Sequence, residues 1–67
     1  MSLSARNRLT GSIKDIKSDD VSSEIILNIG GQEVCSTITT NSVERLNLEV
    51  GDEVTAAIKA SNVIIQK

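Results

Sequence analysis

The chain has 67 residues and a net charge of −2, and it contains no His, Phe, Tyr, Trp or Pro. This length allows one domain, residues 1–67, whose small core supplies little stability. The single Cys35 excludes an internal disulfide, and the absence of His leaves no metal-ligand cluster. By elimination, we expect the chain to gain stability by associating with copies of itself.

The distribution of apolar and charged residues excludes several classes of protein. No stretch approaches the roughly 20 apolar residues that span a bilayer. The first residues, MSLSARNRLT, contain no apolar segment typical of a signal sequence, so we expect a cytoplasmic protein. Residues 18–58 carry eight acids against Arg45 alone, which argues against a broad nucleic-acid surface.

Residues 8–16 are predicted to form the first strand, because the apolar and β-forming character of the chain comes from Val, Ile, Leu and Thr. Ile13 and Ile16 break the strict alternation of a strand. We therefore expect a bulge or bend near Gly11 or Lys14.

A polar turn at residues 17–20 is predicted to lead into a second strand, residues 21–29. Gly30-Gly31 indicates a hairpin, because both glycines adopt positive φ without steric cost. A third strand follows over residues 32–39. The residues expected to share one face in each of these strands are Val21, Ile25, Leu27 and Ile29, and then Val34, Ser36 and Ile38.

Residues 40–48 are the one helix candidate in the chain. Asn41 is predicted to cap this helix, since Glu44 stands three residues on in capping-box spacing. Val43 and Leu46 are predicted to face inward.

The end of the chain supplies the remaining strands. A turn centred on Gly51-Asp52 precedes a fourth strand, residues 54–59, and the tight turn at residues 60–62 precedes a fifth, residues 63–66. The predicted fold is therefore all-β, a five-stranded OB-like barrel with one short helix between strands 3 and 4, in an oligomer.

No catalytic constellation is visible, so we expect no enzyme. The chain has no His to act as a base near neutral pH, and no motif for nucleophilic attack, phosphate binding or metal binding. Asp19 and Asp20 form a carboxylate pair, but adjacent acids in a turn are interpreted as solvated.

The remaining candidate residues offer hydrogen-bond donors and no carboxylate acceptor. Ser4 and Arg6 are two residues apart, so their side chains point the same way in an extended chain. The start of the helix adds hydroxyls and amides that favour an anion. The further donors are Thr39, Thr40, Ser42, Lys59 and the amides around Ala60 and Ser61. The same residues can instead be ordinary surface charges and helix-cap residues. Composition and spacing alone favour this interpretation over an anion site.

Three motifs add a family resemblance. Ser4-Ala5-Arg6-Asn7, followed by Leu9 and Gly11, resembles the SARNxLxG opening of the Mop (molbindin) family of molybdate- and tungstate-binding proteins. The run Ile38-Thr39-Thr40-Asn41-Ser42-Val43 is similar to the hydroxyl-bearing start of that family's helix. The tail Ala57-Ile58-Lys59-Ala60-Ser61-Asn62-Val63 is similar to its closing motif. The resemblance covers essentially the whole chain, and Arg8 departs from the uncharged residue that is frequent there.

The resemblance implies an OB-like domain of TOBE/Mop type, six copies per assembly and oxyanion sites at the contacts between subunits. Molybdenum would be held only as its oxyanion, with no cofactor and no bare metal site. By position, one subunit would offer Ser4, Arg6, Lys59 and the amide of Ala60, and its neighbour Thr39 and Ser42.

The expected function is therefore intracellular binding, storage or buffering of molybdate or tungstate in a homohexamer. Tungstate has nearly the same size and charge as molybdate, so we expect little discrimination between them. One alternative is a structural assembly module whose site has lapsed. Another is an OB-type nucleic-acid-binding protein, which the lack of aromatic residues for base stacking disfavours. We expect neither a nucleic-acid nor a membrane partner.

Overall fold

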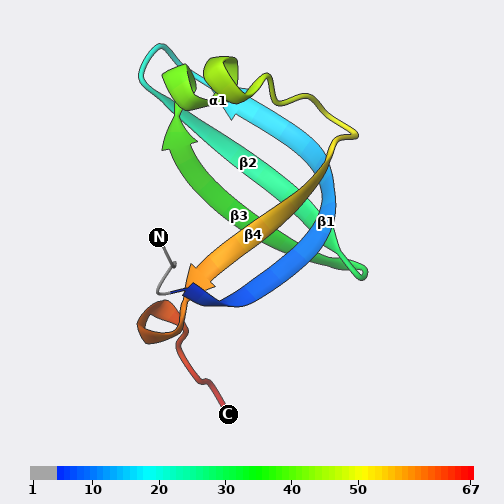
Figure 1. The fold of residues 1–67 in the computed structure, drawn as a ribbon, viewed down its shortest axis with the longest axis vertical. Helices are drawn as coiled ribbons and strands as arrows, with labels where there is room; N and C mark the ends of the chain where they lie inside the picture. The colour runs from blue at the N-terminus through cyan, green and yellow to red at the C-terminus, as the bar shows by residue number, and fades with distance from the viewer. Residues whose placement is uncertain (1–4) are drawn as a thin grey trace.

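A computed structural model of the chain describes residues 5–67 (Figure 1). Four antiparallel strands curl into one sheet with the order β3-β2-β1-β4. The elements are β1 (Ala5–Ser18), β2 (Ser22–Ile29), β3 (Gln32–Thr39), α1 (Thr40–Leu46), β4 (Glu53–Lys59) and the 3-10 helix η1 (Ala60–Asn62). Neither described helix has the length and apolar character of a membrane span.

β1 is a 14-residue strand that pairs with two neighbouring strands. Its first half pairs with β4 and its second half with β2. The register with β2 shifts between Ile13 and Asp15, so Lys14 is the extra residue of a bulge, and the predicted irregularity is confirmed. Because the bulge inserts one residue, Ile13 and Ile16 both turn toward the core. Asp15, two residues after Ile13, is exposed.

Gly11 lies where β1 passes from one partner strand to the other. A Cβ atom at this position would lie 2.3 Å from the carbonyl oxygen of Asn28 and 2.7 Å from Cγ1 of Ile29. Both distances are far shorter than a van der Waals contact, so only glycine lets the two strands approach this closely.

β2 and β3 form the predicted hairpin, with Gly30 at φ 58° and Gly31 at φ 86° in its turn. The inward face of β2 carries Ile25 and Leu27, as expected. Val21 precedes the strand and is exposed, so its predicted place on this face is wrong. The inward position before Ile25 belongs to Ser23, which is completely buried.

The core is small for a chain of this length and holds no aromatic residue. Its fully buried apolar side chains are Ile13, Ile25 and Leu27. The partly buried residues packed against them are Ile16, Ile29, Val34, Ile38, Val43, Leu48, Val54 and Ala56.

α1 begins one residue after the end of β3, and its N-cap is Thr39 rather than the predicted Asn41. Thr39 is still extended, with ψ 146°, and this backbone aims its hydroxyl at the N–H of Ser42. Asn47 ends the helix in the left-handed conformation. Val43 packs against the core as predicted, whereas Leu46 is 60 % exposed.

The predicted fifth strand does not form within the described chain. Residues 63–67 run away from the sheet beyond η1 (Figure 1), and Ile64 and Ile65 are 89 % and 88 % exposed. Val63 has extended backbone angles, but this segment pairs with neither edge strand of its own sheet. The fold is therefore a curled four-stranded OB-like sheet, and it is open between β3 and β4.

Candidate functional site

The predicted donors fall into two groups that lie at opposite ends of the molecule. Arg6, Lys59 and Ala60 lie where β1 begins and β4 ends, whereas Thr39 and Ser42 lie at the start of α1 (Figure 1). We call these the basic group and the hydroxyl pair. Ser4, also predicted as a donor, lies outside the described residues. One chain therefore does not bring the two groups together.

The basic group is built by the pairing of β1 with β4. Ala5 pairs with Lys59 and Asn7 with Ile58, so Arg6 is the extra residue of a second bulge. The Asn7 side chain fixes this end of the ladder by donating to the carbonyl oxygen of Ile58 at 3.2 Å. A bulge changes the direction of the side chain that it carries. Arg6 is exposed, and its neighbour Ala5 pairs with Lys59, so the two basic residues come from the same end of the β1–β4 ladder.

The amide of Ala60 belongs to the same end, since Ala60 is the first residue of η1. The N–H groups at the start of a helix have no acceptor within it, so they can donate to an external group. Within residues 5–67, Lys14 forms an ion pair with Glu33. Neither Arg6 nor Lys59 takes part in this ion pair.

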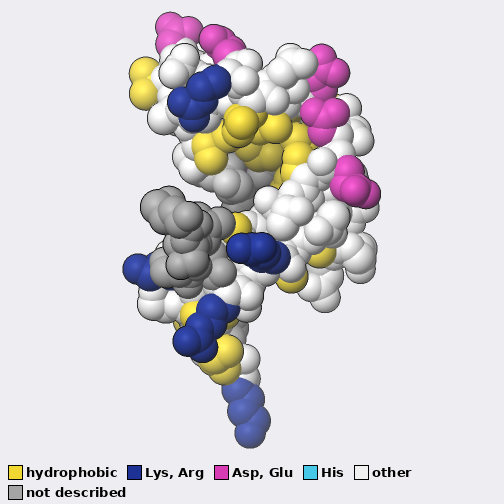
Figure 2. Space-filling model, viewed as in Figure 1, with side chains coloured by type: hydrophobic (Ala, Val, Ile, Leu, Met, Phe, Trp, Pro, Cys, Tyr) yellow, Lys and Arg dark blue, Asp and Glu magenta, His cyan; other side chains and the backbone are white. Residues whose placement is uncertain are grey.

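Charge is segregated along the molecule. On the face shown in Figure 2, most Lys and Arg side chains gather over the end where β1 begins and β4 ends, and Asp and Glu side chains lie toward the opposite end. The basic group therefore lies in a locally positive region of a chain whose net charge is negative.

The hydroxyl pair is held by hydrogen bonds within α1. Thr39 Oγ1 accepts from the N–H of Ser42 at 3.1 Å, and the two hydroxyl oxygens are 2.7 Å apart. Each hydroxyl has one hydrogen. One of the two hydrogens is used within the pair, and the other can be donated to an external acceptor.

The amides at the start of α1 are less available than the sequence suggested. The N–H of Thr40 donates to the carbonyl oxygen of Val21 at 3.0 Å, and the N–H of Ser42 is taken by Thr39. The side-chain hydroxyls, rather than these amides, are the donors that this end can offer.

Asp19 is exposed, in line with its interpretation as a solvated acid, and it also makes defined hydrogen bonds. Its carboxylate accepts from the backbone N–H groups of Ser22 and Val21, each at 2.8 Å. These two hydrogen bonds, the one from Ser22 first, lower the pKa of Asp19 below its ordinary value. The turn between β1 and β2 is thereby fixed next to α1. The sequence predicted a polar turn here but not the contacts of Asp19 or the buried Ser23, although Ser23 continues the inward alternation of Ile25 and Leu27.

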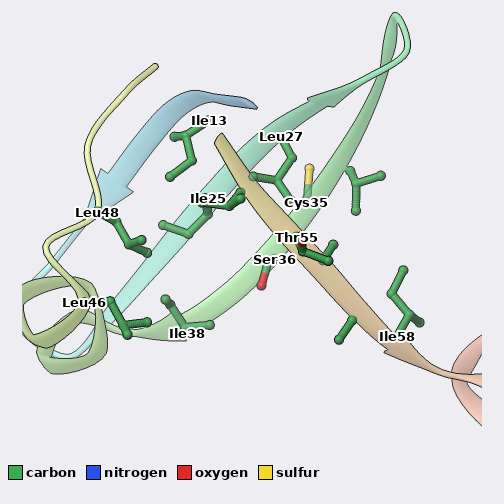
Figure 3. Close-up of a pocket in the computed structure, with 14 residues that line it drawn as sticks. Ile13, Ile25, Leu27, Cys35, Ser36, Ile38, Leu46, Leu48, Thr55 and Ile58 are labelled. Carbon is green, nitrogen blue, oxygen red and sulfur yellow. The ribbon is translucent and has the colours of Figure 1, made fainter. Parts of the chain in front are cut away.

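An apolar hollow with a volume of about 560 Å³ lies between β3 and β4. Figure 3 shows Ile25, Ile38 and Leu48 directed toward this space. Its lining suits an apolar segment rather than an oxyanion. Among the described residues, no three His, Cys, Asp or Glu side chains lie close enough together to hold a metal ion.

Comparison with known proteins identifies relatives of the whole chain. Residues 3–65 match the TOBE domain. Molybdenum-pterin-binding protein 1 of Clostridium pasteurianum is 42 % identical over 66 residues, which cover 97 % of both chains.

Solved structures agree with this match. A molybdate-binding protein from Sporomusa ovata superposes with a TM-score of 0.94 at 37 % identity, and the alignment covers 100 % of both chains. The cytoplasmic molybdate-binding protein ModG, solved with molybdate bound, gives a TM-score of 0.88 at 46 % identity. That alignment covers 96 % of the present chain and 46 % of ModG.

Proposed function

Because the chain belongs to the TOBE domain family and to its Mop branch, we propose that it binds molybdate at sites shared between subunits of a homo-oligomer. Tungstate is expected to bind in the same way. We further propose that the protein stores or buffers the ion in the cytoplasm, the location given for its relative ModG.

The observation that carries the proposal is the separation of the donors. Arg6 and Lys59 lie at one end of the chain, and Thr39 and Ser42 at the other (Figure 1). A second copy that presents its hydroxyl pair to this basic group would complete the donor set. Ser4, by its position in the motif, and the amide of Ala60 would join the basic side.

The chemistry of this donor set suits the ligand. Molybdate is a tetrahedral dianion with four acceptor oxygens and no proton at neutral pH. Arg and Lys would supply charge-assisted hydrogen bonds, and the hydroxyls and the amide neutral ones, with no carboxylate to repel the ion. The relative from Clostridium pasteurianum is described as binding a molybdenum pterin. This chain has no aromatic side chain on which a pterin ring could stack, so the free oxyanion is the ligand that we propose.

The exposed surface of the chain supports association. The chain exposes 5361 Å², whereas a compact monomer of 7.1 kDa exposes roughly 4,100 Å². The excess of about 1,300 Å² is larger than the ~800 Å² that one partner contributes to a standard interface. Residues 63–65 of a second copy are apolar, as is the hollow between β3 and β4. We propose that they occupy it as the missing fifth strand, and that six copies assemble in this way.

Replacing both Ile64 and Ile65 with Ser should therefore weaken the assembly. Burial of each Ile in a partner contributes about 1.5–3 kcal/mol, so the double variant should dissociate at concentrations at which the wild type stays hexameric. Light scattering over a dilution series measures this. Val50→Ser is a matched control, since Val50 is also exposed but lies in the loop between α1 and β4 rather than in the tail. A wild type that is a folded monomer at micromolar concentration would contradict the proposal.

A further inference from the structure

A chain of hydrogen-bonded hydroxyl groups, centred on one buried residue, lies at the start of α1. Ser23, with 0 % of its surface exposed, stands at its centre on the inward face of β2. Its Oγ is 2.6 Å from Ser18 Oγ and 2.8 Å from Thr40 Oγ1. Thr40 Oγ1 in turn donates to the carbonyl oxygen of Asp19 at 2.7 Å. Four groups from β1, the following turn, β2 and α1 are thus joined in series.

The direction of every hydrogen bond in this chain is determined. The carbonyl oxygen of Asp19 can only accept, so the hydrogen of the Thr40 hydroxyl is used there. The contact between Ser23 and Thr40 therefore needs the hydrogen of Ser23. Ser23 then has none left, and Ser18 must donate to it. Removing the hydroxyl of Thr40 would leave the buried hydroxyl of Ser23 without its acceptor, which is costly.

α1 depends on this hydroxyl chain because little else attaches it. The helix has seven residues, none of them buried, and a helix this short does not hold itself together. Two hydrogen bonds hold Thr40 in place. Its hydroxyl donates to the carbonyl oxygen of Asp19, and its N–H donates to the carbonyl oxygen of Val21. Val43 adds a partly buried apolar contact further along the helix.

We propose that Ser23 and Thr40 are positioning residues for molybdate binding. They would act by fixing the place of the Thr39–Ser42 hydroxyl pair on either side of Thr40. This inference rests on the proposed function, in which that pair contacts the oxyanion. Neither Ser23 nor Thr40 would touch the ion, since their hydroxyls are used within the protein.

The test compares Thr40→Val, which keeps the shape of the side chain but not its hydroxyl, with Thr40→Ser, which keeps the hydroxyl. In calorimetry Thr40→Val should weaken molybdate binding about three- to tenfold, the size of one lost hydrogen bond, and Thr40→Ser should bind like the wild type. Thr10→Val is a matched control, because it removes a hydroxyl that bonds to Thr55 in the sheet, away from α1. Ser23→Ala repeats the test if Thr40→Val does not fold.

Two further readouts separate positioning from general destabilisation. Amide hydrogen exchange should speed up in residues 40–46 of Thr40→Val and stay unchanged in β1 and β4. In a Ser42→Ala background, Thr40→Val should have a smaller effect on affinity, since the group through which it acts is already lost.

The failures are distinguishable. If the wild type binds molybdate and Thr40→Val binds equally well, the positioning role is wrong and the proposed function stands. If the wild type binds no molybdate, the proposed function fails and this inference fails with it.

Discussion

Replacing Gly11 with Ala should destabilise the protein by about 3 kcal/mol or more, at the upper end of the usual cost of overpacking. The new methyl group would lie 2.3 Å from the carbonyl oxygen of Asn28, and a backbone atom cannot turn aside as a side chain can. The strands must therefore separate where β1 changes partners, next to the buried Ile13. Urea unfolding monitored by circular dichroism measures the loss.

Gly30→Ala is the matched control for this substitution. Gly30 has φ 58° but open space around it, so Ala there meets only the backbone cost of about 1–2 kcal/mol. An equal loss of stability in the two variants would mean that close approach is not what requires glycine at position 11.

Replacing Arg6 or Lys59 with Ala should each weaken molybdate binding by about 1.5–3 kcal/mol, the usual scale for a hydrogen bond to a charged group. The double variant should bind at least a hundredfold more weakly, since every ~1.4 kcal/mol is a factor of ten. Both side chains are exposed, so the fold should survive. Titration calorimetry measures the affinities.

Lys14→Ala controls for the loss of one positive charge, because Lys14 is exposed at the bulge of β1 and belongs to neither the basic group nor the end beside α1. Its effect should be small and should vanish with added salt. Unchanged affinity in both Arg6→Ala and Lys59→Ala would remove these residues from the site.

Features that depend on neighbouring residues could be predicted from the sequence. The Gly30-Gly31 turn and the bulge at Lys14 follow from residues a few positions apart, and both are present. The fifth strand was predicted on the same local basis and does not form in the single chain. Residues 63–66 have the composition of a strand, but pairing also needs a free edge within reach, which local pattern does not report.

The N-cap residue of α1 also could not be predicted from the local sequence. Asn41 and Thr39 are both good capping residues, and the choice between them depends on where β3 ends. β3 stays paired with β2 as far as Thr39, so the extended residue that caps α1 is Thr39.

The family resemblance assigned Arg6 and Lys59 to one side of the site and Thr39 and Ser42 to the other. The structure pairs Ala5 with Lys59 and holds the hydroxyls of Thr39 and Ser42 2.7 Å apart, and the binding role of these residues stays a prediction. The bulge at Arg6 and the hydroxyls beneath α1 were not predicted. Ser23 is a polar residue on the inward face of β2, and its hydrogen bond to Thr40 of α1 is a long-range contact that the local pattern does not report.

A subunit-mixing experiment tests most directly whether the site is shared between subunits. One variant carries Arg6→Ala and Lys59→Ala, and the other carries Thr39→Val and Ser42→Ala. Each alone should bind molybdate weakly. The two are unfolded together, refolded as a one-to-one mixture and assayed by equilibrium dialysis with molybdenum analysis.

In the mixture, about a quarter of the sites should regain wild-type affinity, because random assembly places an intact basic group beside an intact hydroxyl pair at that frequency. A mixture that binds no more molybdate than the two variants refolded separately would show that each site lies within one chain, and would contradict the account.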